Sequence, residues 1–209
     1  MRSHRPLLAR RFFVAASILV FGVFGYGCGS GSDSTISAQF AASATAPAVD
    51  LVKLIPKTTS GGRVVVQAVV YGPDADIDMY SFAFDVKIGD PTVLEFVAGS
   101  AAAGNALTVS GGQTISVQAG PDQSDPTHIV VGVTKVGGGV GNGVGGSLAS
   151  PVSIVSLTFK SLKQGTSTLA IAAGPTAPTV LDSAGDPIGA ITFDTATGTV
   201  TAISTGGGY

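Results

Sequence analysis

Several residue types on which binding and catalysis commonly depend are missing or scarce in this chain. It has no tryptophan and only four tyrosines in 209 residues, so flat aromatic platforms for stacking sugar rings are few. Its single cysteine excludes an internal disulfide. Glu95 is the only glutamate, so the paired carboxylates that glycoside hydrolysis needs would have to be aspartates. The composition therefore gives little support to an enzyme.

Charge is also scarce, and it is unevenly distributed. Charged residues make up 11% of the chain, and four of the basic ones, Arg2, Arg5, Arg10 and Arg11, lie in the first eleven residues. After residue 27 all 13 acidic residues face only seven basic ones, a net charge of −6. Nucleic-acid binding depends on Lys and Arg neutralising phosphates, so this balance argues against a nucleic-acid partner. It also leaves no basic patch for an anionic membrane surface.

The N-terminal segment is the one long apolar run. The arginines precede FFVAASILVFGVFGY at 12–26, where Ser17 is the only polar interruption. A basic start followed by about 15 apolar residues and small residues is typical of a secretory signal peptide, here residues 1–27. The run is short for a membrane span, which needs roughly 20 residues, although a permanent anchor helix stays open. Arg10-Arg11 leaves twin-arginine export open as a route.

The cysteine stands where this apolar run gives way to Gly and Ser. Gly27-Cys28 resembles the end of the box that closes bacterial lipoprotein signals, whereas Gly25 and Tyr26 depart from it. The resemblance implies that Cys28 becomes the first residue of the exported chain and carries a lipid, which would anchor the protein to the bacterial cell envelope or surface. The alternative is an ordinary signal peptide cut nearby, which leaves a secreted protein with a free thiol.

The remaining chain divides into a linker, one domain and a tail. Residues 28–48 are mostly Gly, Ser, Ala and Thr, which predicts a flexible tether. Residues 49–204 are rich in Val and Thr with turn residues every 8–12 positions, which is typical of an all-β sandwich or barrel. The sequence predicts about nine strands in an antiparallel β-sandwich without βαβ alternation. Residues 205–209 are expected to be a disordered tail.

The clearest strand pattern lies at 80–88. Its odd and even positions differ, with Tyr80, Phe82, Phe84, Val86 and Ile88 alternating with Ser81, Ala83, Asp85 and Lys87. In a half-buried strand such alternation places one set in the core and the other in water. We therefore expect Tyr80 in the core and Asp85 exposed.

The order of these features resembles the cohesin domain family over roughly residues 50–203. The segments that carry the resemblance are MYSFAFDVKIGDPTVLEFV (79–97), SLASPVSIVSLTFKSLKQGTSTLAI (147–171) and VLDSAGDPIGAITFDTATGTVTAI (180–203). The family is a jelly-roll-like β-sandwich that is related to carbohydrate-binding modules. The resemblance implies a noncatalytic module that docks the dockerin-like modules of other proteins, including polysaccharide-degrading enzymes. A carbohydrate-binding or adhesion module linked to polysaccharide catabolism is the alternative.

Three further groups are candidate site residues. His128 follows Pro126-Thr127 at the start of a predicted strand, and we expect it at the surface without a catalytic role because no Gly-x-Ser-x-Gly sequence accompanies it. Asp74 and Asp76 begin an acidic stretch that fits part of a calcium-loop template, but Met79 stands where that loop needs glycine. A solvated loop is favoured, with calcium the one cofactor left open. Tyr71 is the only plausible exposed platform for a sugar ring.

Overall fold

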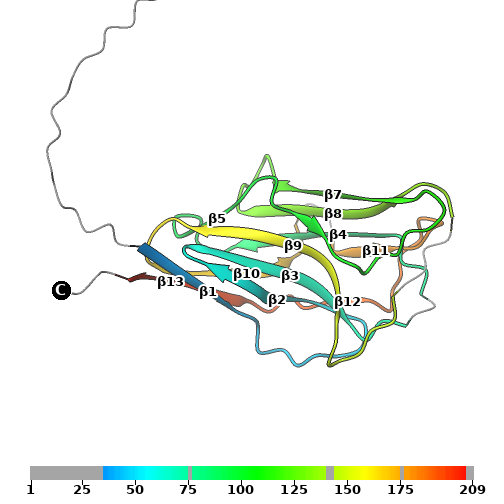
Figure 1. Ribbon diagram of the computed structural model, residues 1–209, viewed down its shortest axis with the longest axis horizontal. Coiled ribbons are helices and arrows are strands. Elements are labelled where there is room, and N and C mark those ends of the chain that lie inside the picture. Colours follow the sequence, from blue (N-terminus) through cyan, green and yellow to red (C-terminus); the bar gives the residue numbers. More distant parts are fainter. Residues whose placement is uncertain (1–34, 75–76, 140–143, 175–176, 206–209) are drawn as a thin grey trace, which may run out of the picture. The chain divides into compact units, whose positions relative to one another are not determined.

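The computed structural model describes residues 35–74, 77–139, 144–174 and 177–205. This part of the chain contains thirteen strands and no helix (Figure 1). The strands are β1 (Thr35–Ala41), β2 (Leu51–Ser60), β3 (Arg63–Tyr71), β4 (Ser81–Ile88), β5 (Leu94–Phe96), β6 (Ala102–Ala103), β7 (Thr114–Pro121), β8 (His128–Val136), β9 (Val152–Ser161), β10 (Gly165–Ala172), β11 (Thr179–Leu181), β12 (Thr192–Phe193) and β13 (Gly198–Thr205).

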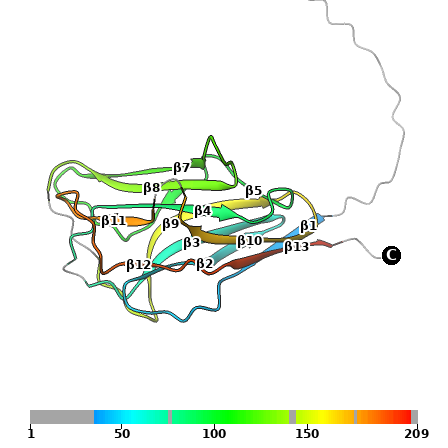
Figure 2. The ribbon, with the colours of Figure 1, turned by 180° about the vertical axis from the view of Figure 1, so that it is seen from behind.

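The strands form two sheets that pack face to face, seen from opposite sides in Figures 1 and 2. Sheet A has the order β1-β13-β10-β4-β8-β7, with β11 also paired to β4. Sheet B has the order β12-β2-β3-β9-β5, with β6 also paired to β9. All pairs are antiparallel except β12–β2. The predicted antiparallel β-sandwich is confirmed, and the strands beyond the expected nine include four of only two or three residues.

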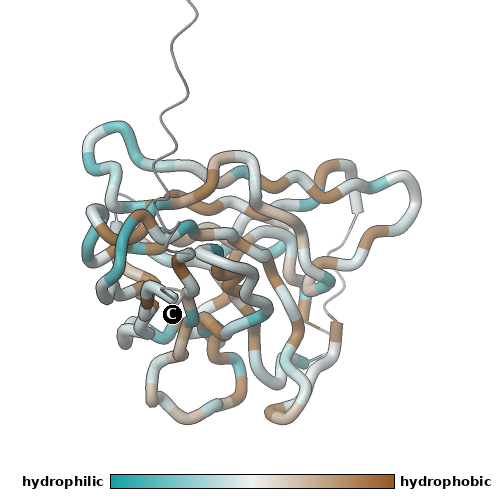
Figure 3. Tube along the Cα trace, turned by 60° about the vertical axis from the view of Figure 1, so that its left-hand side comes forward, coloured by the Kyte–Doolittle hydropathy of each residue, from teal (hydrophilic) through white to brown (hydrophobic). Residues whose placement is uncertain are grey.

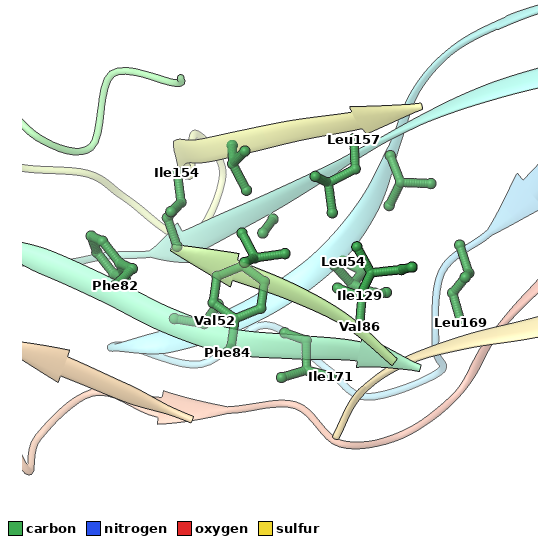
Figure 4. Packing of buried hydrophobic residues seen from close by; sticks show 14 of the residues in the cluster. Val52, Leu54, Phe82, Phe84, Val86, Ile129, Ile154, Leu157, Leu169 and Ile171 are labelled. Carbon is green, nitrogen blue, oxygen red and sulfur yellow. The ribbon is translucent and has the colours of Figure 1, made fainter. Parts of the chain in front are cut away.

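The core lies between the two sheets and is built by alternation along the strands. On β4 the side chains of Phe82, Phe84, Val86 and Ile88 are all buried, as the sequence pattern predicts. Figure 4 shows Phe82, Phe84 and Val86 facing side chains of sheet B such as Val52, Leu54, Ile154 and Leu157. Hydrophobic and polar positions alternate in the same way along the chain trace in Figure 3.

Tyr80 does not belong to this buried row. It precedes β4 and is only partly buried, and its hydroxyl donates a hydrogen bond to the Gly137 carbonyl at 2.6 Å. The sequence pattern therefore places one residue too many in the buried row, because the strand begins at Ser81. Tyrosine tolerates this position because its hydroxyl finds a partner at the surface.

The segment predicted to be a flexible tether is partly folded. Residues 35–41 form β1, which pairs with β13 from Thr35↔Thr205 to Ala41↔Thr199. Ala38 and Phe40 of this strand are buried in the core, at 1% and 6% exposure. Two buried apolar side chains and a complete ladder outweigh the low apolar content of the surrounding segment. The last strand likewise extends to Thr205, one residue into the predicted tail.

The strands and the core all fall within one compact unit, Ser32–Tyr209. Every residue of the described core lies within this unit, and since a unit with its own hydrophobic core can fold alone, we expect a fragment of residues 32–209 to fold. In the described part of the chain, no helix has the length and apolar character needed to cross a membrane. Residues 1–34, with the predicted signal peptide and Cys28, lie outside the described residues.

Candidate functional site: the outer face of sheet A

Side chains on the outer face of β4, β8 and β7 form three regular rows. The strand registers place Ser81 beside Thr134 and Ser116, Ala83 beside Gly132 and Gln118, and Asp85 beside Val130 and Gly120. Apart from Asp85, every position in these rows carries a small or uncharged side chain. At their centre Gly132 leaves space, since a Cβ added there would meet nothing within 4 Å.

The second row, together with Val130 and Gly120 of the third, lines a shallow hollow of about 410 Å³. A second hollow continues along the same strands past Ser81, Ser116 and Thr134. Val130, 38% exposed, stands at the side of the first hollow. An uncharged, weakly concave sheet face with exposed apolar area has the character of the centre of a protein-binding surface, and it offers no enclosed volume for a small substrate.

A charged cluster lies at one end of this face. Asp85, expected to be exposed, is 1% exposed, and the side chain of His128, expected at the surface, is 11% exposed. Their atoms Oδ2 and Nδ1 lie 3.5 Å apart, longer than a usual hydrogen bond. Neither oxygen of Asp85 accepts a hydrogen bond from the described residues. Asp85 is hidden because Gly174 packs onto it, so closely that a Cβ there would lie 1.3 Å from Oδ2.

The turn between β7 and β8 completes this cluster. Asp125 Oδ2 lies 3.7 Å from the Nε2 atom of His128. Asp125 Oδ1 accepts hydrogen bonds from the hydroxyl and the backbone N–H of Thr127, and these lower the pKa of Asp125. Bonds from Ser124 lower the pKa of Asp122 in the same way. Both ring nitrogens of His128 thus face carboxylates, whereas a catalytic triad needs one nitrogen on a nucleophile.

Burial has the largest effect on the pKa of Asp85 and raises it. The imidazole of His128, 3.5 Å from Oδ2, opposes this shift, while the charge of Asp122 adds to it. The net shift is upward. Burial without hydrogen-bond donors disfavours the charged form of an acid, so the ionised form of Asp85 is destabilised at this end of the face.

The other predicted site residues lie apart from this face. Tyr71 is 8% exposed and cannot serve as an exposed stacking platform; burial raises its pKa. Asp74 is exposed in the loop after β3, and Asp76 lies outside the described residues. Among the described residues, no three His, Cys, Asp or Glu side chains gather closely enough to hold a metal ion. Glu95 pairs with Lys160 at 3.4 Å on the surface of sheet B.

A second buried charged group was not anticipated from the sequence. Lys53, on the outward side of β2, is 5% exposed, and its Nζ donates to the carbonyls of Ser43 and Thr45. Asp194 Oδ2 lies 4.0 Å from this Nζ and accepts a 2.5 Å hydrogen bond from the Ser43 hydroxyl. This cluster fastens the segment between β1 and β2 to sheet B. A lone lysine in a strand pattern gives no signal for such a role, because the groups that bury it come from distant segments.

No protein-family model and no curated protein matches the sequence. Solved structures that it matches include a type II cohesin domain from the cellulosome of Acetivibrio cellulolyticus, at 18% identity and a TM-score of 0.43, covering 74% of this chain and 94% of that one. They also include type II cohesin A11 from Bacteroides cellulosolvens, at 12% identity and a TM-score of 0.44, covering 70% of this chain and 96% of that one. A third is a type II cohesin–X-dockerin complex from Acetivibrio cellulolyticus, at 11% identity and a TM-score of 0.43, covering 75% and 94%. At these low values the matches carry no argument about this chain's partners.

Proposed function

We propose that this chain is a noncatalytic binding module that docks a dockerin-like module of another protein on the outer face of β4, β8 and β7. The observation that supports this most directly is the uncharged hollow around Ala83, Gly132 and Gln118. The order of sequence segments that resembles the cohesin family agrees with a docking role. The residues of this face come from the segments 81–88, 114–121 and 128–136, whose strands pair without a register shift.

The geometry favours a protein over a polysaccharide as the partner. Of the residues lining the two hollows on this face, Phe82 alone is aromatic, and its side chain is 1% exposed in the core. Sugar rings bind by stacking on exposed aromatic faces, whereas a flat, partly apolar sheet surface suits a protein surface of matching shape. Partners that belong to polysaccharide-degrading systems would then be held through their own docking modules.

The test is affinity capture with residues 32–209 from the secreted and envelope proteins of the source organism. We expect enrichment of proteins that share one dockerin-like module, identified by mass spectrometry. Gly132→Glu places a charge in the hollow without a clash, because the space there is open, and it should abolish capture. Thr201→Glu, on the exposed outer face of β13, is the matched control and should capture normally. Equal capture by both variants, or no protein sharing such a module, would refute the docking role.

We further propose that Cys28 is lipidated and holds this module at the bacterial cell envelope. The support is its position at the end of the apolar run at 12–26. Metabolic labelling with a fatty acid should mark the full chain, and Cys28→Ser should release it from the membrane fraction. A labelled Cys28→Ser variant, or an unlabelled wild-type chain, contradicts the anchor without affecting the docking proposal.

A further inference from the structure

Strand β7 forms an open edge of sheet A. It pairs with β8 over eight consecutive residues, Thr114↔Val136 to Pro121↔Ile129, with no register shift. No backbone hydrogen bond reaches its residues 114–119 from any described segment other than β8. Unpaired strand edges are templates for pairing with another strand, and proteins usually blunt them with charges, prolines, bulges or very short strands.

β7 carries almost none of these protections. Its sequence, TISVQAGP, has no charged residue, and its one proline is the last position. By contrast, the outermost strands β12 and β5 of sheet B have two and three residues. The opposite edge of sheet A, β1, packs beside the β2–β3 turn, where Ala38 N–H donates to the Gly61 carbonyl. Beyond Leu51 and Val52, the outer side of β2 has no strand partner either, but β2 carries Pro56, Lys57 and a register shift. Among the described strands β7 is therefore the long open edge without such protection.

The outward-facing backbone groups of β7 can be identified from the ladder. Asp122 N–H donates to the His128 carbonyl, and hydrogen-bonded pairs alternate along an antiparallel ladder. Counting back from this pair, residues 116, 118 and 120 bond to β8. The N–H groups of Ile115, Val117 and Ala119 therefore point away from the sheet. Pro121 also faces this way but has no N–H to offer.

We propose that a second copy of this chain pairs with β7, so that two molecules join antiparallel through their β7 strands into one continuous sheet. A two-fold axis at Val117 would place Ile115 opposite Ala119 of the other copy and form about six hydrogen bonds between the outward groups. In such a symmetric pair Val117 meets its own counterpart, and Ser116 meets Gln118 of the other copy. A charge there would meet a like charge, and β7 has none.

A second copy of this chain is the occupant that brings the same free backbone groups in matching number, on an edge that carries no charge. One strand pair buries less than the roughly 1,200 Å² of stable interfaces, so the dimer should be weak.

The experiment is sedimentation of residues 32–209 over about 1 µM to 1 mM, with amide hydrogen exchange at both limits. We expect the mass to rise from one to two chains with concentration. The amides of Ile115, Val117 and Ala119 should become at least tenfold better protected, while those of Ser116 and Gln118 stay unchanged. A monomer at every concentration, or a dimer without this alternating protection, overturns the proposal.

Two variants locate the contact. Ala119→Pro removes one outward N–H without touching the β8 ladder, and Ser116→Lys with Gln118→Lys sets like charges opposite each other across the axis while keeping the backbone groups. Each should weaken the dimer at least tenfold with its thermal unfolding still cooperative. The double-lysine variant decides the matter if the proline variant does not fold.

Gln39→Lys on β1, an exposed position of the opposite edge, is the control and should dimerise normally. Dimers that survive the double-lysine change refute pairing through β7. The result is independent of docking, which is read from capture by Gly132→Glu.

Discussion

Replacing Asp194 by alanine should destabilise the domain more than any other single change at a charged residue. Its Oδ1 accepts hydrogen bonds from the Thr45 hydroxyl at 3.0 Å and the Ala196 N–H at 3.1 Å, and its Oδ2 accepts one from Ser43 at 2.5 Å. The change leaves these donors unpaired and removes the carboxylate beside the ammonium of Lys53, 4.0 Å away. Breaking a buried charged pair from one side costs about 3–5 kcal/mol, a large share of the roughly 5–15 kcal/mol that holds a domain folded.

The assay is equilibrium unfolding of residues 32–209 in urea at pH 7. We expect the midpoint to fall with little change in slope, because the surface exposed on unfolding stays nearly the same. Asp194→Asn keeps an acceptor oxygen and should cost less, about 1.5–3 kcal/mol. Asp186→Ala, at an exposed aspartate nearby, should stay within about 0.5 kcal/mol. A loss below about 1 kcal/mol for Asp194→Ala would show that the cluster is solvated and the reasoning wrong.

The same cluster predicts a pH dependence. Burial acts to raise the pKa of Asp194, but the bonds from Ser43, Ala196 and Thr45 and the charge of Lys53 outweigh it, so the pKa lies below its ordinary value. A carboxyl with a lowered folded-state pKa stabilises fully above its unfolded pKa, about 3.9, and this contribution is lost as the pH falls through the folded value. The deficit of Asp194→Ala relative to wild type should therefore be full at pH 7 and shrink below about pH 4. A deficit that does not change with pH would contradict the assigned charge.

Two further changes test the packing of the outer face of sheet A. Gly174→Ala would put a Cβ 1.3 Å from Asp85 Oδ2 and should lower the free energy of unfolding by about 1–3 kcal/mol through overpacking. Gly132→Ala meets open space and should leave stability unchanged or raise it slightly. Equal effects of the two variants on the melting temperature would refute the close contact. Asp85→Asn should raise the melting temperature at pH 7. Burial raises the pKa of Asp85, so the folded state of the wild type loses stability as the pH rises above the unfolded pKa, and the amide carries no charge to lose it with. The gain should vanish near pH 3, where the carboxyl is protonated in both states, and a loss of stability at pH 7 would mean that the charge itself is needed.

Local patterning was sufficient to identify the fold class and strand β4. The alternation at 80–88 predicts β4, apart from Tyr80, because the strand's own side chains form its part of the core. It was insufficient for β1, since the burial of Ala38 and Phe40 depends on β13, more than 150 residues further along the chain. It was likewise insufficient for short strands such as β12, which exist only through their pairing with another strand. The hollow at Gly132 could have been found from the outward positions of 128–136, had the registers of β4 and β7 been known.

Asp85 and Lys53 are buried for one common reason, whereas Lys135, 3% exposed, lies on the inward side of β8. Alternation tells which side of the sheet a residue points to, but not whether a connecting segment crosses above it. Asp85 points outward and is covered where the chain passes at Gly174, and Lys53 points outward and is covered by residues 43–45. The outward positions at Ala83, Gly132 and Gln118 have no such cover and line an open hollow. The uncovered part of this face thus carries small, uncharged side chains, while Asp85 lies beneath a crossing segment. Contact with a protein partner costs such a surface little desolvation free energy, because few charges must be stripped of water.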